Sequence, residues 1–257
     1  MCLVAIAVGV DPEFPLVLVG NRDEFHSRPS VPMHWWRSPR LLAGRDLEAG
    51  GTWLALTRGG HLATVTNFRE PDTVPGTRSR GALVVRSLSD ETRPFVEHLE
   101  EAGAEYGGFN LLWWDGRALR YHSNRVAAGI RTLPAGVYGL SNGVLDAQWP
   151  KLVRCREALR GLLSGGRITV EECFAILRDR HVPADGDLPR TGITHDWERL
   201  LSTAFIISPR YGTRAASVVM MRRDGTVCVQ ERGYDPQGHE TTRRSFRFVR
   251  TGAAVAS

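Results

Sequence analysis

The sequence predicts an α+β protein built as a four-layer αββα sandwich, in which two mainly antiparallel sheets are covered by outer helices. Apolar segments are repeatedly joined by glycine-containing turns, a pattern typical of antiparallel hairpins. Segments 3–10 and 215–221 are apolar at successive positions rather than at alternate ones, so we expect both faces of their sheet to be covered. Helical patterns gather in two blocks, near 82–105 and 149–180, and these blocks can supply the covers.

Composition is that of one globular domain. The chain has 257 residues and 42% hydrophobic content, enough to bury a sizeable core. No linker-like tract divides it, so we expect a single domain over residues 1–251 and a loose tail over 252–257. The longest apolar run, about nine residues, is too short for a bilayer span. It also lacks the features of a signal peptide, and we therefore expect a soluble, cytoplasmic protein.

The net charge of +5 does not indicate nucleic-acid binding. All basic residues except Lys151 are arginines, they are scattered along the chain, and no basic helix appears. No P-loop is present, and a Schiff-base lysine is not expected. The partner that we expect is a small-molecule substrate or ligand, and the sequence makes no prediction of the oligomeric state.

The first 24 residues predict a site. Two apolar segments are separated by a turn near Asp11, and the second ends in the polar quartet 21–24, Asn-Arg-Asp-Glu. Buried polar groups cost several kcal/mol each when they have no partner, so a site explains the quartet better than a plain strand end does. An antiparallel hairpin would bring the quartet alongside Cys2. A structural cluster of salt bridges is the alternative interpretation.

The middle of the chain alternates hairpins with one helical block. We expect a loop over 25–45, a hairpin over 50–67 and a second hairpin over 106–122. Gly50 and Gly51 indicate a bulge or a close approach of backbones. The block 82–105 is expected to be helical, with a cap at Ser89 and Asp90.

The last third supplies two helices and the closing strands. A short strand over 136–140 leads to Ser141-Asn142-Gly143, and a helix opened by Pro150 ends at Gly165 and Gly166. A second helix is expected over about 170–180, followed by an irregular segment over 181–200. The closing strands are expected at 204–208, 215–221, 226–230 and 245–249.

The four cysteines differ in their surroundings. They show no CxxC spacing, so we expect neither disulfides nor a metal site. Cys155, Cys173 and Cys228 lie in amphipathic segments and are expected in the core. Cys2 follows Met1, which processing removes when the second residue is small. The alternative for Cys2 is a frayed terminal residue without a role.

Several sequence blocks together resemble the NRDE family, which is the family of transport and Golgi organisation protein 2. The blocks follow the family's order over nearly the whole chain, at 1–2, 20–25, 27–29, 50–54, 66–67, 108–111, 141–143, 149–151 and 211–214. This resemblance implies an N-terminal-nucleophile (Ntn) hydrolase-like fold, similar to choloylglycine hydrolase and penicillin V acylase. Those relatives cleave non-peptide amides with a cysteine that is exposed after Met removal.

The family resemblance also leaves a second function open. NRDE proteins have been linked to haem trafficking and to lipid or acyl-coenzyme A homeostasis. One hypothesis is therefore a Cys-nucleophile hydrolase that acts on a non-peptide amide or thioester with a small apolar acyl part. The other is a protein that binds haem or an acyl lipid in the same pocket. No cofactor is expected, and haem enters only as a possible ligand.

The chemistry of an N-terminal cysteine agrees with the implied hydrolase class. Once Met1 is gone, the amine and the thiol belong to the same residue, and the neutral amine can take the thiol proton. Asp23 would hold the amine, while Arg22 would favour the thiolate. In choloylglycine hydrolases the corresponding Arg and Asp are three residues apart, whereas here they are adjacent. Either Asp23 or Glu24 can therefore face the amine.

Amide side chains at strand ends are the candidate oxyanion donors. Asn67 and Asn142 each end an apolar strand and carry a neutral donor, although both could also cap turns. Arg214, in a family block, completes the candidate catalytic set. Candidate substrate contacts are Asn21, Glu24, Trp53, Asn110 and Trp35. Trp35, Trp36 and Trp113 would line an apolar mouth or, as such aromatics more often do, lie in the core.

Overall fold

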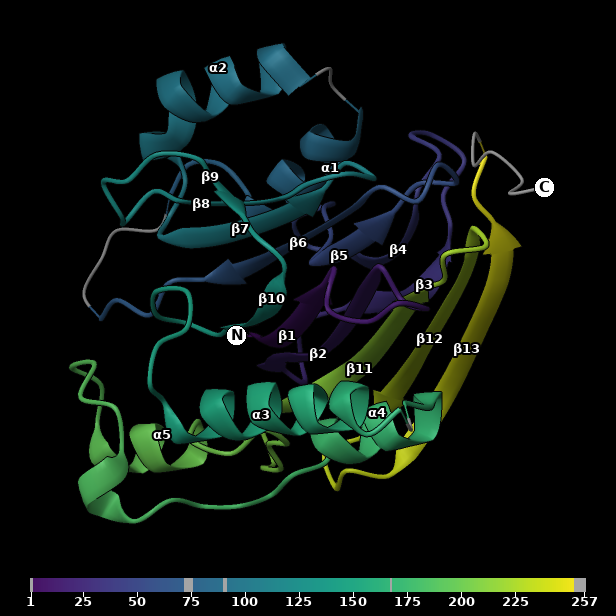
Figure 1. Cartoon of the computed structure of the whole chain (residues 1–257). Coiled ribbons are helices and arrows are strands. Elements are labelled where there is room, and N and C mark those ends of the chain that lie inside the picture. The colour runs from purple at the N-terminus through teal and green to yellow at the C-terminus, as the bar shows by residue number, and fades with distance from the viewer. Residues whose placement is uncertain (1, 72–75, 90–91, 167, 252–257) are drawn as a thin grey trace.

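The strands form two antiparallel sheets (Figure 1). The computed structural model describes residues 2–71, 76–89, 92–166 and 168–251, so the predicted tail 252–257 lies outside the described residues. The first sheet has the order β10 (Gly136–Leu140), β1 (Cys2–Val8), β2 (Leu16–Phe25), β11 (Tyr211–Met221), β12 (Thr226–Tyr234) and β13 (Glu240–Val249). The second sheet has the order β3 (Ser30–Trp35), β4 (Leu42–Asp46), β5 (Leu54–Leu56), β6 (Leu62–Asn67), β7 (Phe109–Trp114), β8 (Leu119–Ser123) and β9 (Arg131–Leu133).

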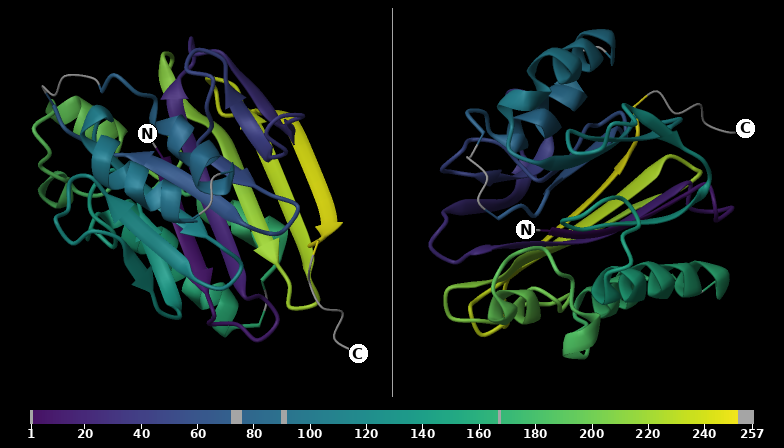
Figure 2. Two further views of the ribbon diagram at one scale, coloured as in Figure 1. Left: turned by 90° about the horizontal axis from the view of Figure 1, so that it is seen from above. Right: turned by 90° about the vertical axis from the view of Figure 1, so that its left-hand side faces the viewer.

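Helices cover the outer face of each sheet. The second sheet is covered by α1 (Arg80–Ser89) and α2 (Thr92–Ala102), which continues into a 3₁₀ turn, η1 (Gly103–Glu105). The first sheet is covered by α3 (Pro150–Ser164) and α4 (Val170–Leu177), with η2 (Asp185–Asp187) and α5 (His195–Leu200) beyond them. Figure 2 shows the resulting layers from two further sides. The predicted α+β fold of two antiparallel sheets with outer helices is confirmed.

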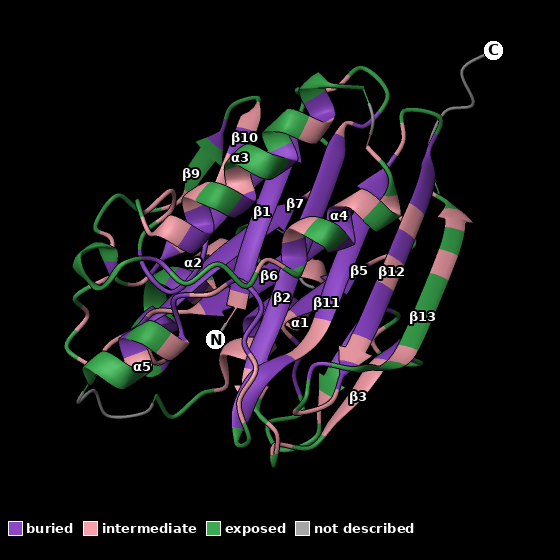
Figure 3. Ribbon diagram, turned by 90° about the horizontal axis from the view of Figure 1, so that it is seen from below, coloured by how far each residue is buried: buried purple, intermediate pink, exposed green. Residues whose placement is uncertain are grey.

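The apolar character of β1 on both faces follows from this layering. Val4 and Ile6 pack in the core between the sheets, whereas Leu3 and Ala5 pack against α3 and α4. A third core lies between the second sheet and α1 and α2. Figure 3 shows β1, β2 and β11 buried, while β13, at the edge of its sheet, is largely exposed. The expectation that both faces are covered is confirmed.

Two segments differ from the sequence-based prediction. The expected loop over 25–45 contains β3 and β4. Pro32 of β3 has no amide hydrogen to donate, and it is tolerated because β3 is an edge strand. The expected strand over 204–208 is not a strand. The amide of Phe205 donates to the carbonyl of Asp179, and that of Ile206 donates to the Thr213 hydroxyl, so neither joins a strand ladder.

The helix predictions hold with shifted ends. The block over 82–105 is divided into α1 and α2, and the proposed cap residue Asp90 lies outside the described residues. The helix α3 begins at Pro150, as predicted, and α4 ends at Leu177. The segment 181–200 holds η2 and α5 rather than being wholly irregular. In the described part of the chain, no helix is both long and apolar enough to cross a membrane.

Candidate active site

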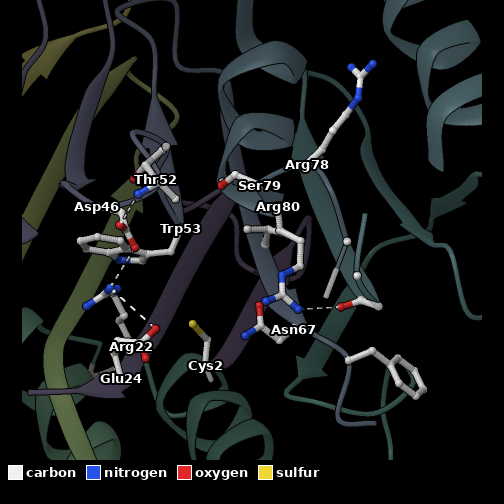
Figure 4. A pocket seen from close by; sticks show the side chains of 18 of the residues that line it. Cys2, Arg22, Glu24, Asp46, Thr52, Trp53, Asn67, Arg78, Ser79 and Arg80 are labelled. Atoms are coloured by element: carbon white, nitrogen blue, oxygen red, sulfur yellow. Dashed lines mark hydrogen bonds and ion pairs between the residues drawn. The ribbon is translucent and has the colours of Figure 1, made fainter. Parts of the chain in front are cut away.

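Cys2 begins β1 directly opposite Arg22 of β2, so the predicted hairpin brings the polar quartet beside the thiol. The Cys2 side chain is half-buried and lines a cavity of about 670 Å³ (Figure 4). Its backbone carbonyl accepts a hydrogen bond from the Ser141 hydroxyl at 3.1 Å, which fixes the start of the strand. Among the described lining residues, Cys2 is the one cysteine.

Strand alternation divides the quartet between two faces of the sheet. Arg22, opposite Cys2, lies on the face toward the second sheet together with Glu24. Asn21 and Asp23 lie on the face toward the helices. The Asn21 amide donates to the carbonyls of Leu177 and Ala204 at 2.8 and 2.7 Å, so it ties β2 to the end of α4. Asn21 is not among the described residues that line the cavity.

Arg22 is held by an ionic cluster at the edge of the cavity. Its guanidinium lies 3.5 Å from a carboxylate oxygen of Asp46 and 3.9 Å from one of Glu24. It also stacks over the ring of Trp53, 4.5 Å from the ring centroid. Asp46 in turn accepts a 2.6 Å bond from Arg28. Arg22, Glu24 and Trp53 are therefore brought together, as expected from the sequence, and all three line the cavity.

Asp23 is fully buried and has partners that the sequence did not suggest. Its carboxylate accepts a 2.7 Å hydrogen bond from the Thr213 hydroxyl of β11. Burial raises the pKa of Asp23, and the positive charge of Lys151 opposes that shift. Burial likewise lowers the pKa of Lys151 to about 8, while Asp23 raises it. Lys151, the chain's one lysine, is thus a buried charge in the first turn of α3 that acts on Asp23, although it is not among the described lining residues.

The three asparagines of the later strands have different positions. Asn67, at the end of β6, lines the cavity. The Asn142 amide donates to the backbone carbonyl of Asn67 at 2.9 Å and thereby holds that strand end. Asn110 donates to Thr66 and to the carbonyl of Gly143 at 3.3 and 3.0 Å. Neither Asn142 nor Asn110 is among the described lining residues.

Arg214 and Trp35 are not among the described residues that line the cavity. The guanidinium of Arg214 donates to the backbone carbonyls of Phe25 and Arg28 and so holds the chain that follows β2. Trp35 packs edge-on against Phe248, with ring centroids 5.4 Å apart. Trp36 and Trp113 are buried in the core beneath α1 and α2, which is the more ordinary of the two expectations for these aromatics.

The cavity has two walls. The strand wall consists of Cys2, Arg22, Asp23 and Glu24. The helix wall consists of Asn67 and of residues 79–81, where α1 begins. Asn67 was a predicted site residue, whereas residues 79–81 were not predicted, because they follow a long polar loop without a recognisable motif.

Burial has the largest influence on the pKa of the Cys2 thiol. Burial raises the pKa of Cys2, and this effect exceeds the opposing influence of Arg22. Arg22 lowers the thiol pKa, in the expected direction, but burial outweighs it and the net shift is upward. The buried thiols of Cys155 and Cys173 have pKa values raised to about 12, also by burial. An attack by Cys2 consequently needs a base to receive its proton.

Metal binding has no support in the described part of the chain, where no group of three or more His, Cys, Asp or Glu is arranged to hold an ion. The arrangement instead supplies a thiol, a buried carboxylate, cationic groups and an amide donor around one cavity. Those groups suit nucleophilic attack on a carbonyl and stabilisation of the resulting oxyanion.

Comparisons with known proteins give one consistent family. The family model described as "Transport and Golgi organisation 2" matches residues 1–236. A "Transport and Golgi organization protein 2 homolog" of Bos taurus is 31% identical over 261 residues, covering 91% of this chain and 93% of the relative. The homologue of Homo sapiens is 31% identical over 238 residues, covering 85% and 86%. Among solved structures, a C2A mutant of conjugated bile acid hydrolase from Clostridium perfringens aligns over 98% of both chains, with 10% identity and a TM-score of 0.43.

Proposed function

The chain belongs to the transport and Golgi organisation 2 family, as its sequence blocks predicted, and from its cavity we propose that it is an N-terminal-cysteine hydrolase. The substrate class is a non-peptide amide, or a thioester, with a small apolar acyl part. The observation that carries the proposal is the position of Cys2: it starts a buried strand, lies opposite Arg22 and lines a cavity of about 670 Å³.

The proposed nucleophile needs Met1 to be removed. The freed amine of Cys2, with a pKa of about 8, then receives the proton that the thiol loses. The sulfur forms a bond to the substrate carbonyl carbon, and collapse of the tetrahedral intermediate breaks the carbon–nitrogen bond. The ammonium returns the proton to the leaving amine. Water then attacks the thioester and restores the free thiol.

The proposed roles of the surrounding residues follow from their contacts. Asp23, buried and bonded to Thr213, favours the protonated amine. The positive charge of Lys151 favours the ionised form of the Asp23 carboxylate and opposes the effect of burial. Asn67 is the proposed oxyanion donor because its side chain lines the cavity. Asn142 is a positioning residue that holds the Asn67 backbone. Arg214 positions the chain that follows β2.

Turnover can be tested with a matched pair of proteins. The full chain is purified once with Met1 removed and once with Met1 retained, by inhibiting methionine aminopeptidase during expression. A panel of N-acyl amides and acyl thioesters is then screened for amine or thiol release, with acid-quenched intact mass used to detect the acyl thioester on Cys2. Turnover by the processed protein, and its absence in Cys2→Ala and in the Met1-retaining chain, is expected. An equal rate in Cys2→Ala would contradict the proposal.

The same variant separates hydrolysis from carriage of a ligand. Trp53, Val65 and Phe68 give the cavity apolar surface on which an acyl chain can pack. The described lining residues include no histidine, methionine or tyrosine. Cys2 is therefore the one described lining residue of a type that commonly ligates haem iron. Saturable binding of an acyl lipid by both wild type and Cys2→Ala, without turnover of any compound, would favour a binding protein.

A further inference from the structure

Arg80 differs from the other arginines that line the cavity. Each of the others has a carboxylate partner: Arg22 and Arg28 pair with Asp46 at 3.5 and 2.6 Å, Arg69 with Glu198 at 2.8 Å, and Arg78 with Glu105 at 2.5 Å. Within the described part of the chain, Arg80 has one hydrogen bond, to the carbonyl of Gly108 at 3.3 Å, and no carboxylate within ion-pair distance. The described residues therefore supply no ion-pair partner for its positive charge.

The side chain of Arg80 extends into the cavity. In Figure 4 it runs from the start of α1 toward the side on which Asn67 lies, whereas Arg78 runs away from the cavity. Burial lowers the pKa of Arg80, and the charges of Cys2, Glu24 and Glu70 oppose that shift without forming an ion pair with its guanidinium in the described structure. A half-buried guanidinium without a carboxylate partner is an unfavourable arrangement for stability alone. An anion in the cavity would complete it.

The start of α1 is fixed by a close backbone contact. A Cβ atom added to Gly51 would lie 2.5 Å from the carbonyl carbon of Gly81, so only glycine permits this approach. The Thr52 amide also donates to the carbonyl of Gly81 at 3.4 Å. The first turn of α1 carries no acidic side chain, so its amide groups and Arg80 both favour a negative charge at this end of the cavity.

Arg69 differs from Arg80 in how its charge is held. Its side chain is 5% exposed and lines the same cavity. In the described structure its Nε and Nη2 groups have no hydrogen-bond partner, although Nη1 donates to Glu198. Its guanidinium also lies over the ring of Trp149, 4.8 Å from the ring centroid, so the charge of Arg69 is held within the fold and does not indicate a ligand.

We infer that the substrate carries an anionic group, a carboxylate or a phosphate, which Arg80 binds while the scissile carbonyl lies at Cys2. This inference rests on the proposed function, because it places the anion relative to the nucleophile of that reaction. Arg80 is then the residue that selects substrates by charge. Asn67, on the same wall, remains available to the oxyanion.

A matched pair of alkylating reagents tests this inference without a known substrate. Iodoacetate and iodoacetamide are similar in size, and with both the Cys2 sulfur bonds to the methylene carbon as iodide leaves. Only iodoacetate carries a carboxylate. Labelling rates of Cys2 are measured by intact mass on the processed full chain with Cys228→Ser, which removes the half-buried second thiol. The ratio of the two rates cancels any change in the thiolate fraction.

Arg80→Gln is expected to lower the iodoacetate rate about tenfold and to change the iodoacetamide rate less than twofold, because a charge-assisted hydrogen bond is lost. Arg80→Lys should retain part of the preference. Arg78→Gln is the matched control, because it removes the same charge two residues away, from a side chain that pairs with Glu105. An unchanged rate ratio in Arg80→Gln, or an equal loss in Arg78→Gln, would overturn the inference.

Protection experiments identify the anionic group. Sodium phosphate and sodium acetate, added at constant ionic strength, are expected to slow iodoacetamide labelling in the parent protein and not in Arg80→Gln. The anion that protects Cys2 more strongly indicates which group the substrate carries. Equal protection of both proteins would overturn a role for Arg80. Failure of either reagent to label Cys2 would instead contradict the proposed function, so the two failures are distinguishable.

Discussion

Charged side chains have partners within the fold on the strand wall of the cavity, whereas Arg80 on the helix wall has no described carboxylate partner. On the strand wall, Arg22 has Asp46, Glu24 and the face of Trp53 as neighbours, and Asp23 has Thr213 and the charge of Lys151. On the helix wall, the described contacts of Arg80 are limited to one backbone carbonyl. Both walls border the same cavity (Figure 4).

This difference separates two uses of a charged side chain. A charge whose partners lie within the fold holds strands in register and positions its neighbours, and its removal should lower stability. A charge without such partners is typical of a binding position, where the partner arrives with the ligand. Stability measurements and ligand measurements should therefore respond to different walls.

The largest expected effect on stability is at Asp23. Asp23→Asn removes the buried carboxylate that accepts from Thr213 and whose charge opposes the burial of Lys151, and we expect the free energy of unfolding to fall by about 3 kcal/mol. Urea denaturation at pH 7 measures it. The control is Asp23→Asn combined with Lys151→Met, which should recover most of the stability without recovering Cys2 reactivity. Wild-type stability in Asp23→Asn would show that Asp23 does not offset the buried charge of Lys151.

A smaller effect is expected at Arg22. Arg22→Gln removes the contacts to Asp46 and Trp53, and the free energy of unfolding should fall by about 2 kcal/mol. Arg28→Gln is the matched control, because Arg28 is 27% exposed and its loss should lower that free energy by less than about 1 kcal/mol. A larger loss of stability in Arg28→Gln than in Arg22→Gln would contradict the structural role of Arg22.

Glu231 extends the comparison to the interior between the sheets. It accepts a 2.6 Å bond from the Met33 amide, and burial raises its pKa from 4.5 to about 7. Between these values the folded protein holds a proton that the unfolded chain has lost, so the free energy of unfolding falls as pH rises through this window. Glu231→Gln should be more stable than wild type by about 2 kcal/mol at pH 8 and similar to it at pH 4.5.

The measurement for Glu231 is the melting temperature of both proteins at each pH. The Gln side chain keeps an oxygen that can accept from Met33, so the hydrogen bond is matched between the two proteins. A constant difference between variant and wild type across the pH range would show that the carboxyl group does not titrate in this window.

The smallest expected effect on stability is at Arg80. Arg80→Gln removes a charge without a carboxylate partner in the described structure, so the free energy of unfolding should stay within about 0.5 kcal/mol of wild type. Urea denaturation beside Arg22→Gln gives the direct comparison. A loss equal to that of Arg22→Gln would place Arg80 among the structural residues and remove the contrast between the walls.

Local pattern was enough to predict the strand wall. The turn near Asp11 and the apolar segments on either side of it define a hairpin, and its register places Cys2 opposite Arg22. The two-sided apolar character of β1 also predicted helices outside the sheet. The sandwich could therefore be derived from hairpins, strand faces and the position of the helical blocks.

Contacts between distant segments could not be derived in this way. Asp23 and Thr213 are 190 residues apart in the chain, and no local pattern indicates that they bond. Asn142 shows the converse case, because its position at a strand end suggested a cavity role while the fold uses its amide internally. The amide of Asn110, a candidate substrate contact, is likewise used within the fold. Arg80 was missed because one arginine at a helix start has no distinctive sequence pattern.

The proposed mechanism depends on the freed amine of Cys2, which activates the thiol of the same residue. Its most direct test is the rate of Cys2 labelling by iodoacetamide near pH 7.5, followed by intact mass, in processed and Met1-retaining chains that both carry Cys228→Ser. We predict that protein from the native host lacks Met1 and that its Cys2 reacts about tenfold or more faster than in the Met1-retaining chain. Retention of Met1 in the native host, or equal labelling rates in the two chains, would contradict this mechanism.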